Sequence, residues 1–492
     1  MPFVELTQRE FFAMQITAPT NDVLGTADAG AIAARIAAGE ISSEEAVGAA
    51  IERLRAVDPE LHATVCERFE QALAEAGGLP AERCLEPFSG VPSLIKDNTA
   101  VAGLPTRHGS RATGAAPASR DDDYTRVFRA TGLIPIAKTA LPEFGLTATT
   151  EPTRAAATRN PWNTAFSSGG SSGGSAALVA AGVVPVAHAN DGGGSIRIPA
   201  ACCGVVGLKP SRDRLPTIAL AQRMPVNIIV EGVVSRTVGD TAAFYAAVER
   251  HYSGPDLPLI GRVSGPGRRR LRIGLGLEHP LGEACDPEVV ATVERVARLC
   301  ETLGHRVEPF SSPVDSRMAD DFFLYWSRLA AAANYLGRFA FGEGYDRSQL
   351  EPLTRQLSRH YLSRSWRSPG AIRRLRRFGA TYRALFGHYD LILSPVLATP
   401  PVAIGHLALD LPFDTALQRL RHYAAFTPAQ NVAGTPAISL PLGRSRAGLP
   451  IGVQFAAGMG QERQLLELAF ELEQAMPWSY PASAEAAAPD AS

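Results

Sequence analysis

The chain has 492 residues, of which 46% are hydrophobic and 20% charged, and its formal net charge is −1. This length allows two or three domains or one large α/β domain, and it supplies enough apolar residues for a sizeable core. The balanced charge excludes strong electrostatic attraction to nucleic acid or to anionic membranes. The composition therefore favours an enzyme for a small molecule, with no nucleic-acid or membrane partner.

The cysteines and histidines show no familiar disulfide or ligand spacing. Six cysteines and ten histidines occur without a C-x-x-C pair or an H-E-x-x-H motif. Charged residues interrupt positions 1–19, which therefore lack the apolar core of a signal peptide, and the low-charge stretch 175–189 is shorter than the roughly 20 residues that span a bilayer. We predict a cytoplasmic protein with no metal.

Helical periodicity follows a predicted N-terminal extension of residues 1–24. From Thr26 to Glu70, apolar residues recur every three or four positions, and Ser42 with Glu45 forms a capping box for the second of two helices. Further along, short apolar runs alternate with helical or glycine-rich stretches, which predicts an α/β sheet with helices on both faces. The predicted strands of this part are Val91–Ile95, Leu133–Ala137 and Val183–Ala187.

A second α/β unit is predicted in the C-terminal half. Asp286 and Pro287 provide an N-cap and a first helical residue, and residues 315–385 are helical and rich in arginines, whose spacing is typical of a solvated face. We predict one large α/β domain over residues 25–480, in which residues 315–385 form an inserted helical cap that shapes the substrate pocket. Residues 481–492 are predicted to be a disordered tail. The remaining predicted elements are strands Leu271–Leu275, His305–Pro309, Leu391–Pro401, Ala437–Pro441 and Ile451–Phe455 and helix Glu462–Gln474.

Two clusters of glycine and serine dominate the sequence, at 169–175 and at 191–195. Glycines this dense cost backbone entropy unless the fold needs positive φ or close backbone approach. The first cluster matches the G-x-S-x-G nucleophile elbow, which would make Ser172 the nucleophile, but this pattern arises easily by chance in a glycine-rich segment. It also suits a phosphate cradle of a small-molecule kinase, although no Walker lysine follows the glycines.

A third interpretation uses both clusters together with Lys96, which ends an apolar run. A lysine has a reference pKa of about 10.4, so a neutral amine near pH 7 needs a shift of about three units, which burial and hydroxyl hydrogen bonds can supply. A serine between this lysine and a second serine would relay a proton, and the glycine N–H groups would face a developing oxyanion. Every cluster then has a function.

The segment from Gly169 to Pro210, with DGGGSIRIPA followed by CCGVVGLKP, resembles the amidase signature family. The resemblance implies a single α/β/α domain around a large mixed sheet, without metal or cofactor. By match of motif, Ser195 is the expected nucleophile, Ser171, 24 residues earlier, the relay serine on a cis peptide bond, and Lys96 the base. It further implies an oxyanion hole of the Gly192, Gly193, Gly194 and Ser195 N–H groups, with Ser172, Asp191 and Arg197 in support.

Two departures from the family pattern stand out: Asn190, where threonine or serine is common, and Gly192, where a bulkier residue is common. Within the family the motif is most similar to the branch that contains the 6-aminohexanoate cyclic dimer hydrolase. We expect hydrolysis of a linear or cyclic carboxamide C–N bond other than a peptide bond. A catalytic subunit of a glutamine-dependent amidotransferase and an acyltransferase that uses an amine are the alternatives. The expected partner is a small-molecule amide, and a homodimer is left open.

Overall fold

The computed structural model describes residues 14–79, 86–217, 219–222, 224–254 and 256–481. Positions 482–492 of the predicted tail and positions 1–13 of the predicted extension lie outside the described residues. The rest of the extension packs on the body of the protein, because Ala18 and Leu24 are buried and the Ala18 N–H donates to the Ala181 carbonyl at 2.7 Å. No helix among the described residues has the length and apolar character needed to cross a membrane.

The N-terminal helices are α1 (Ala29–Ala37) and α2 (Ser43–Leu61). The predicted capping box is confirmed: Ser42 Oγ accepts the Glu45 N–H at 3.0 Å, and the Glu45 carboxylate accepts the Ser42 N–H at 2.7 Å. The prediction of helix as far as Glu70 is wrong at its end. His62 takes a left-handed conformation that ends α2, and β1 (Thr64–Glu67) then pairs antiparallel with another strand. Tertiary pairing decides this segment, which carries the β-favouring residues threonine and valine.

A mixed eight-stranded sheet forms the centre of the molecule, in the order β10-β9-β11-β13-β12-β7-β8-β6. Strands β10, β9 and β11 run parallel to one another, and the remaining pairs are antiparallel. Beside it lies a three-stranded sheet in the order β1-β3-β2, and a short two-stranded ladder joins β4 to β5. The strands are β2 (Pro92–Lys96), β3 (Ile134–Thr139), β4 (Arg159–Asn160), β5 (Asn163–Ser167), β6 (Val186–Asp191), β7 (Val206–Lys209), β8 (Val230–Ser235), β9 (Arg272–Leu275), β10 (Arg306–Pro309), β11 (Leu391–Pro395), β12 (Ala437–Arg444) and β13 (Pro450–Ala457).

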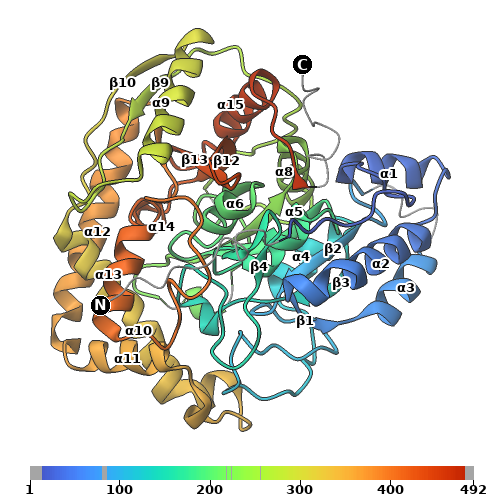
Figure 1. The fold of residues 1–492 in the computed structure, drawn as a ribbon, viewed down its shortest axis with the longest axis horizontal. Coiled ribbons are helices and arrows are strands. Elements are labelled where there is room, and N and C mark those ends of the chain that lie inside the picture. Colours follow the sequence, from blue (N-terminus) through green and yellow to red (C-terminus); the bar gives the residue numbers. More distant parts are fainter. Residues whose placement is uncertain (1–13, 80–85, 218, 223, 255, 482–492) are drawn as a thin grey trace.

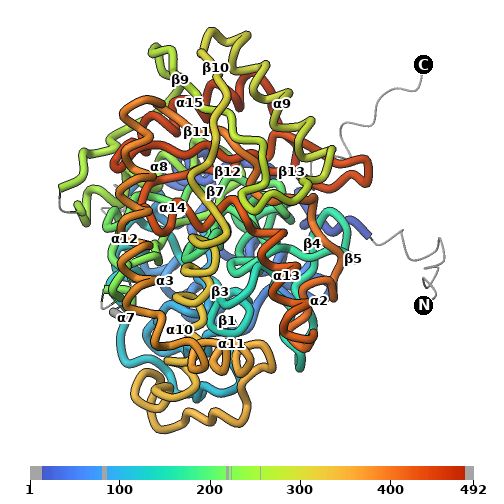
Figure 2. Tube along the Cα trace, turned by 90° about the vertical axis from the view of Figure 1, so that its left-hand side faces the viewer, coloured from blue at the N-terminus to red at the C-terminus, as the bar shows by residue number. Residues whose placement is uncertain are grey.

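Helices flank the large sheet, and the predicted α/β class is confirmed (Figure 1). Helices α5, α6, α8, α9 and α15 pack against its strands, while α10, α11 and α12 form a group of their own at one side (Figures 1 and 2). The remaining helices are α3 (Phe69–Gly77), α4 (Asp123–Ala130), α5 (Gly173–Ala180), α6 (Arg197–Cys203), α7 (Ala219–Gln222), α8 (Val238–Val248), α9 (Pro287–Thr302), α10 (Ser316–Phe341), α11 (Pro352–Leu362), α12 (Ser368–Ala384), α13 (Phe413–Tyr423), α14 (Pro428–Ala433) and α15 (Glu462–Ala475), with 3₁₀ turns at Glu143–Gly145, Arg347–Gln349, Ser365–Arg367 and Leu385–Gly387.

Most predicted strands agree with the structure to within a few residues, with two differences. The strand predicted at Val183–Ala187 begins only at Val186 and runs on to Asp191, because residues 182–185 form the turn after α5 and β6 then pairs with β8 along its whole length. The strand predicted at Leu391–Pro401 ends at Pro395, where the chain leaves the sheet.

Four chain segments meet beside the large sheet. The end of β2 carries Lys96 and the end of β6 carries Asp191, while α5 begins at Gly173 and α6 begins at Arg197. The two glycine-serine clusters are the turns that lead into these two helices. The topology therefore brings together segments that the sequence separates by as much as 100 residues.

Candidate active site

Lys96 is fully buried at the end of β2 and contacts three polar side chains. Its Nζ lies 2.7 Å from Ser171 Oγ, 2.8 Å from Ser172 Oγ and 2.7 Å from Asn190 Oδ1. Burial lowers the pKa of the Lys96 amine to about 7, against the charges of Glu231 and Asp191, which raise it. Near neutral pH the amine is therefore present in both its charged and its neutral form.

The first glycine-serine cluster is packed so tightly that side chains are excluded at several positions. A Cβ on Gly173 would lie 2.3 Å from Thr150 Oγ1, and one on Gly174 would lie 2.4 Å from the Ala63 carbonyl oxygen. The Gly170–Ser171 peptide bond is cis, as the family resemblance implies. Ser172, the nucleophile of the elbow interpretation, is buried, and its hydroxyl is shared between Lys96 and the main chain of Asn190.

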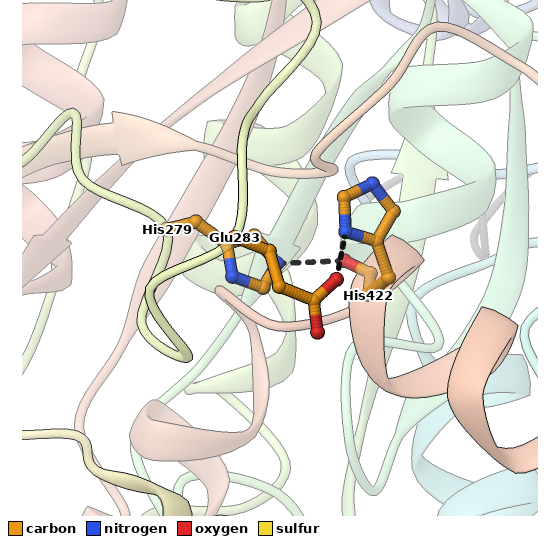
Figure 3. Close-up of side chains that lie close together, drawn as sticks. All are labelled: His279, Glu283 and His422. Atoms are coloured by element: carbon orange, nitrogen blue, oxygen red, sulfur yellow. Dashed lines mark hydrogen bonds and ion pairs between the residues drawn. The ribbon is translucent and has the colours of Figure 1, made fainter.

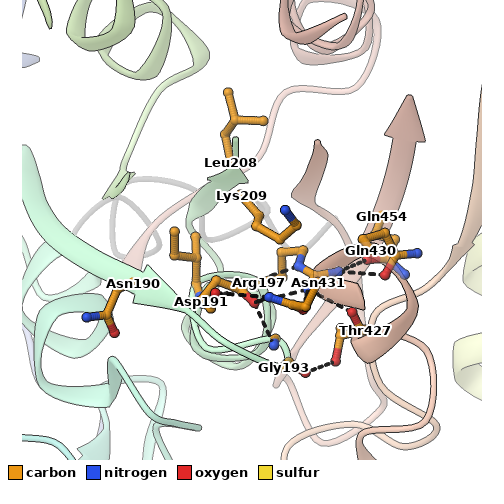
Figure 4. Close-up of polar contacts among 12 residues, drawn as sticks. Asn190, Asp191, Gly193, Arg197, Leu208, Lys209, Thr427, Gln430, Asn431 and Gln454 are labelled. Atoms are coloured by element: carbon orange, nitrogen blue, oxygen red, sulfur yellow. Dashed lines mark hydrogen bonds and ion pairs between the residues drawn. The ribbon is translucent and has the colours of Figure 1, made fainter. Parts of the chain in front are cut away.

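The second cluster is held by a buried ion pair between Asp191 and Arg197 (Figure 4). Asp191 Oδ1 accepts the Gly194 N–H at 2.7 Å, and its Oδ2 accepts the Ile196 N–H at 3.1 Å. Burial alone would raise the pKa of Asp191, but the Arg197 guanidinium lowers it to about 2, so the carboxylate stays ionised. Because the Gly194 N–H is already donated to Asp191, we correct the predicted oxyanion hole and remove Gly194 from it.

Residues far along the chain complete this support (Figure 4). Arg197 donates to the Thr427 carbonyl at 2.8 Å and to Asn431 Oδ1 at 2.7 Å, and Thr427 Oγ1 donates to the Gly193 carbonyl at 2.6 Å. Within the described residues, the N–H groups of Gly192, Gly193 and Ser195 have no acceptor. These three donors therefore stay available to a ligand. The sequence analysis missed Thr427, because a threonine about 230 residues away carries no local signal.

Ser195 lies where two pockets meet, and the residue is 7% exposed. The first, here called the apolar pocket, is lined by Ser195 and by Leu281, Met318, Phe322, Phe323, Trp326 and Leu420 among others. The second, here called the lysine-side pocket, is lined by Ser195 and by Asn98, His108, Phe144, Ser171, Asn190 and Phe341 among others. No hydrogen bond joins the Ser195 hydroxyl to another described residue, so a substrate atom has access to it.

Aromatic side chains of α10 line both pockets, and Trp326 lines each of them. The ring of Trp326 approaches Gly192, where a Cβ would lie 3.2 Å from it, and Phe322 approaches Gly193 in the same way at 3.3 Å. A glycine at position 192, which departs from the family pattern, therefore makes room for Trp326. Of the other aromatic residues in this part of the chain, Tyr325 instead hydrogen-bonds the Val226 carbonyl, and Tyr335 is 54% exposed.

His279, Glu283 and His422 are chain neighbours of Leu281 and Arg421, which line the apolar pocket, and their ligand atoms lie within 4.8 Å of one another (Figure 3). His279 uses both ring nitrogens for the main chain: Nδ1 accepts the Leu281 N–H at 3.2 Å, and Nε2 donates to the His422 carbonyl at 3.1 Å. His422 Nδ1 in turn pairs with the Glu283 carboxylate at 2.7 Å. His279 therefore has no free lone pair with which to bind a metal ion. The hydrogen bonds of the cluster instead hold the loop that contains Leu281 against α13.

The Amidase family model matches residues 45–466, and the chain belongs to this family. The AmiC protein of Mycobacterium leprae is 48% identical over 93% of this chain and 97% of its own length, and the 6-aminohexanoate-cyclic-dimer hydrolase of Paenarthrobacter ureafaciens is 36% identical over 92% and 95%. Among solved structures, a 6-aminohexanoate cyclic dimer hydrolase complexed with substrate superposes with a TM-score of 0.82, at 32% identity over 93% of this chain and 98% of that one. The protein is an amide hydrolase that acts on carbon–nitrogen bonds other than peptide bonds.

Proposed function

We propose that the protein hydrolyses neutral, largely apolar amides through an acyl-enzyme on Ser195. Neutral Lys96 takes a proton through Ser171 as Ser195 attacks the carbonyl carbon, and Ser171 then returns a proton to the leaving nitrogen. The N–H groups of Gly192, Gly193 and Ser195 stabilise the oxyanion. Water completes the cycle by hydrolysing the acyl-enzyme. The observation that carries this proposal is the contact of Lys96 with Ser171 in a site where the amine is partly neutral near pH 7.

The two pockets support an assignment of the two halves of the substrate. Ser171 lines the lysine-side pocket and not the apolar pocket. Since Ser171 protonates the leaving nitrogen, the amine half belongs in the lysine-side pocket, and the acyl half belongs in the apolar pocket. The only charged side chain that lines the apolar pocket within the described residues is Arg421, and Asp320 neutralises it at 2.8 Å. An acyl group with its own charge would lose hydration there without a free counter-charge.

Variants of Ser195 and Lys96 test the mechanism. We expect Ser195→Ala to abolish amide hydrolysis in a folded protein, and Lys96→Ala to lose more activity on anilides than on p-nitrophenyl esters of the same acyl group, whose leaving group needs no protonation. Unchanged turnover by Ser195→Ala would refute the acyl-enzyme. Equal losses of Lys96→Ala on anilides and esters would assign Lys96 a structural role.

A substrate panel tests the pocket assignment and the alternative functions. Anilides of apolar acids should be cleaved with a higher kcat/KM than glutamine or amides of dicarboxylic acids, because only the latter carry charge into the apolar pocket. Efficient glutaminase activity would contradict the assignment and favour an amidotransferase subunit. Excess hydroxylamine in the same assay distinguishes hydrolysis from transfer of the acyl group to an amine.

A further inference from the structure

A buried histidine–glutamate pair lies directly behind Lys96 and takes no part in the mechanism above. His188 lies on β6 and Glu231 on β8, and both side chains are fully buried. His188 Nε2 lies 2.8 Å from Glu231 Oε2, and His188 Nδ1 accepts the main-chain N–H of Lys96 at 3.2 Å. His188 opposes Val233 in the strand register, so Glu231 is its diagonal neighbour on the same face of the sheet.

The hydrogen bonds of His188 determine where the charge of this pair resides. Because Nδ1 accepts the Lys96 N–H, it carries a lone pair, and the ring proton is on Nε2 and is donated to Glu231. His188 is therefore neutral, and Glu231 acts on Lys96 as a negative charge that raises the pKa of the amine. Oε1 of Glu231 has no hydrogen-bond partner within the described residues, so no second donor offsets the negative charge of this carboxylate.

The other charged groups around Lys96 are compensated by their own partners. Asp191 is paired with Arg197, and Asp97 is paired with Lys138 at 2.8 Å. The titratable groups that face the His188–Glu231 pair from the packed elements are Lys96 on β2, Asp191 on β6, and Tyr124 and Asp122 at α4. The rings of Tyr124 and His188 lie 4.4 Å apart at a tilt of 38°, and Asp122 caps α4. Of these anions, Glu231 has the largest Coulombic effect on Lys96.

We propose that Glu231, acting through His188, is a positioning residue for Lys96: the pair fixes the main chain of Lys96 and supplies the buried negative charge that balances its ammonium form. The proposal rests on the proposed function, in which Lys96 must both accept and return a proton. Desolvation alone would leave the amine too weak a base to hold the proton taken from Ser195. The charge of Glu231, which is separated from Lys96 by the imidazole of His188, offsets part of this effect of desolvation without forming a direct ion pair.

Glu231→Gln tests this role, because Gln keeps an oxygen that accepts the His188 Nε2–H and removes only the charge. The pH below which the reaction declines, here called the acid limb, reports the protonation of Lys96. We expect the acid limb to move down from about 7 by about one unit in Glu231→Gln. At pH 6 the neutral fraction of Lys96 then rises from roughly a tenth to roughly a half, so the rate relative to its own maximum rises about five-fold.

The assay is the pH dependence of Ser195 labelling by a fluorophosphonate, which needs no known amide substrate. Glu231→Asp keeps the charge and should keep the acid limb near that of the unaltered protein. Asp240→Asn replaces another buried acidic side chain, which accepts the Ala29 N–H at 2.9 Å and has no Coulombic effect on Lys96, and it should leave the acid limb unmoved. If Glu231→Gln does not fold, His188→Leu provides a second test, because it removes the imidazole through which Glu231 acts on Lys96.

The outcomes separate this proposal from the proposed function. An acid limb that is present in the unaltered protein but does not move in Glu231→Gln, or in His188→Leu, overturns the role of Glu231 and leaves only a structural one. A fluorophosphonate that labels Ser195→Ala as fast as the unaltered protein, or a rate without an acid limb near pH 7, instead overturns the proposed function. A downward shift in Glu231→Gln, restored in Glu231→Asp, supports the proposal.

Discussion

Asn190→Asp is the sharpest test of how Lys96 is kept partly neutral. The substitution is nearly isosteric and places a carboxylate where Asn190 Oδ1 now lies, 2.7 Å from Lys96 Nζ. Two unit charges at this distance attract by about 6 kcal/mol at an effective dielectric constant of about 20, before the desolvation of the new carboxylate is subtracted. An opposite charge in contact usually shifts a pKa by about 1 to 3 units. We therefore expect the pKa of Lys96 to rise from about 7 to about 8–10.

The sign of the effect on activity follows from the neutral form of Lys96 being the base. At pH 7 the neutral fraction falls from about a half to between about a tenth and about a thousandth, so kcat/KM should fall about 5- to 500-fold and recover as the pH rises. The pH profiles of anilide hydrolysis and of fluorophosphonate labelling measure this directly. Asn98→Asp is the matched control, because Asn98 Oδ1 accepts the Asn190 amide at 3.1 Å and is one residue further from Lys96; its shift should be smaller. An acid limb that stays near pH 7 in Asn190→Asp, or an equal loss at every pH, would refute the reasoning.

Three further substitutions probe the rest of the site. Ser172→Ala removes one of the three side-chain partners of Lys96 and should lower kcat about ten-fold with KM unchanged; an unaltered kcat in steady-state assays would leave Ser172 only a packing role. Gly194→Ala places a Cβ 2.3 Å from Thr427 Oγ1 at φ +133°, so Tm and kcat should both fall, the latter at least about 100-fold, whereas a normal Tm would contradict the tight packing of this loop. Trp326→Ala removes an aromatic side chain that lines both pockets and should raise KM about ten-fold for anilides with long acyl chains but little for acetanilide; equal effects on both would count against the acyl assignment.

The sequence predicts those parts of the fold that depend on short-range chemistry. The capping box at Ser42 is local, and so is the cap at Asp286, which accepts the Glu288 N–H at 2.8 Å. The glycine clusters are informative for a related reason. A glycine such as Gly194 is required wherever another part of the chain approaches closely, and this requirement is visible before the approaching residue is known.

Features that depend on distant residues could not be predicted in this way. The helix predicted through Glu70 fails because β1 finds a partner strand about 70 residues later. The oxyanion prediction included Gly194 because the sequence does not reveal that the Asp191 carboxylate turns back onto this N–H. From the sequence, His188 among the small apolar residues of β6 is most simply interpreted as a core residue. Its relation to Lys96 and Glu231 appears only once three strands are placed side by side.

The arrangement around Lys96 explains why an amide contacts this amine while the carboxylate lies further away. With a carboxylate in direct contact, the ammonium form of Lys96 would be favoured at neutral pH, and little neutral amine would be left to act as the base. Without a nearby anion, desolvation would lower the pKa further, and the amine could not hold the proton that it must return to the leaving group. Asn190 contributes a dipole at 2.7 Å, and Glu231 contributes a full charge through the imidazole of His188. Removing the distant charge and adding a charge in contact should therefore move the acid limb in opposite directions, a pair of results that general damage to the site would not produce.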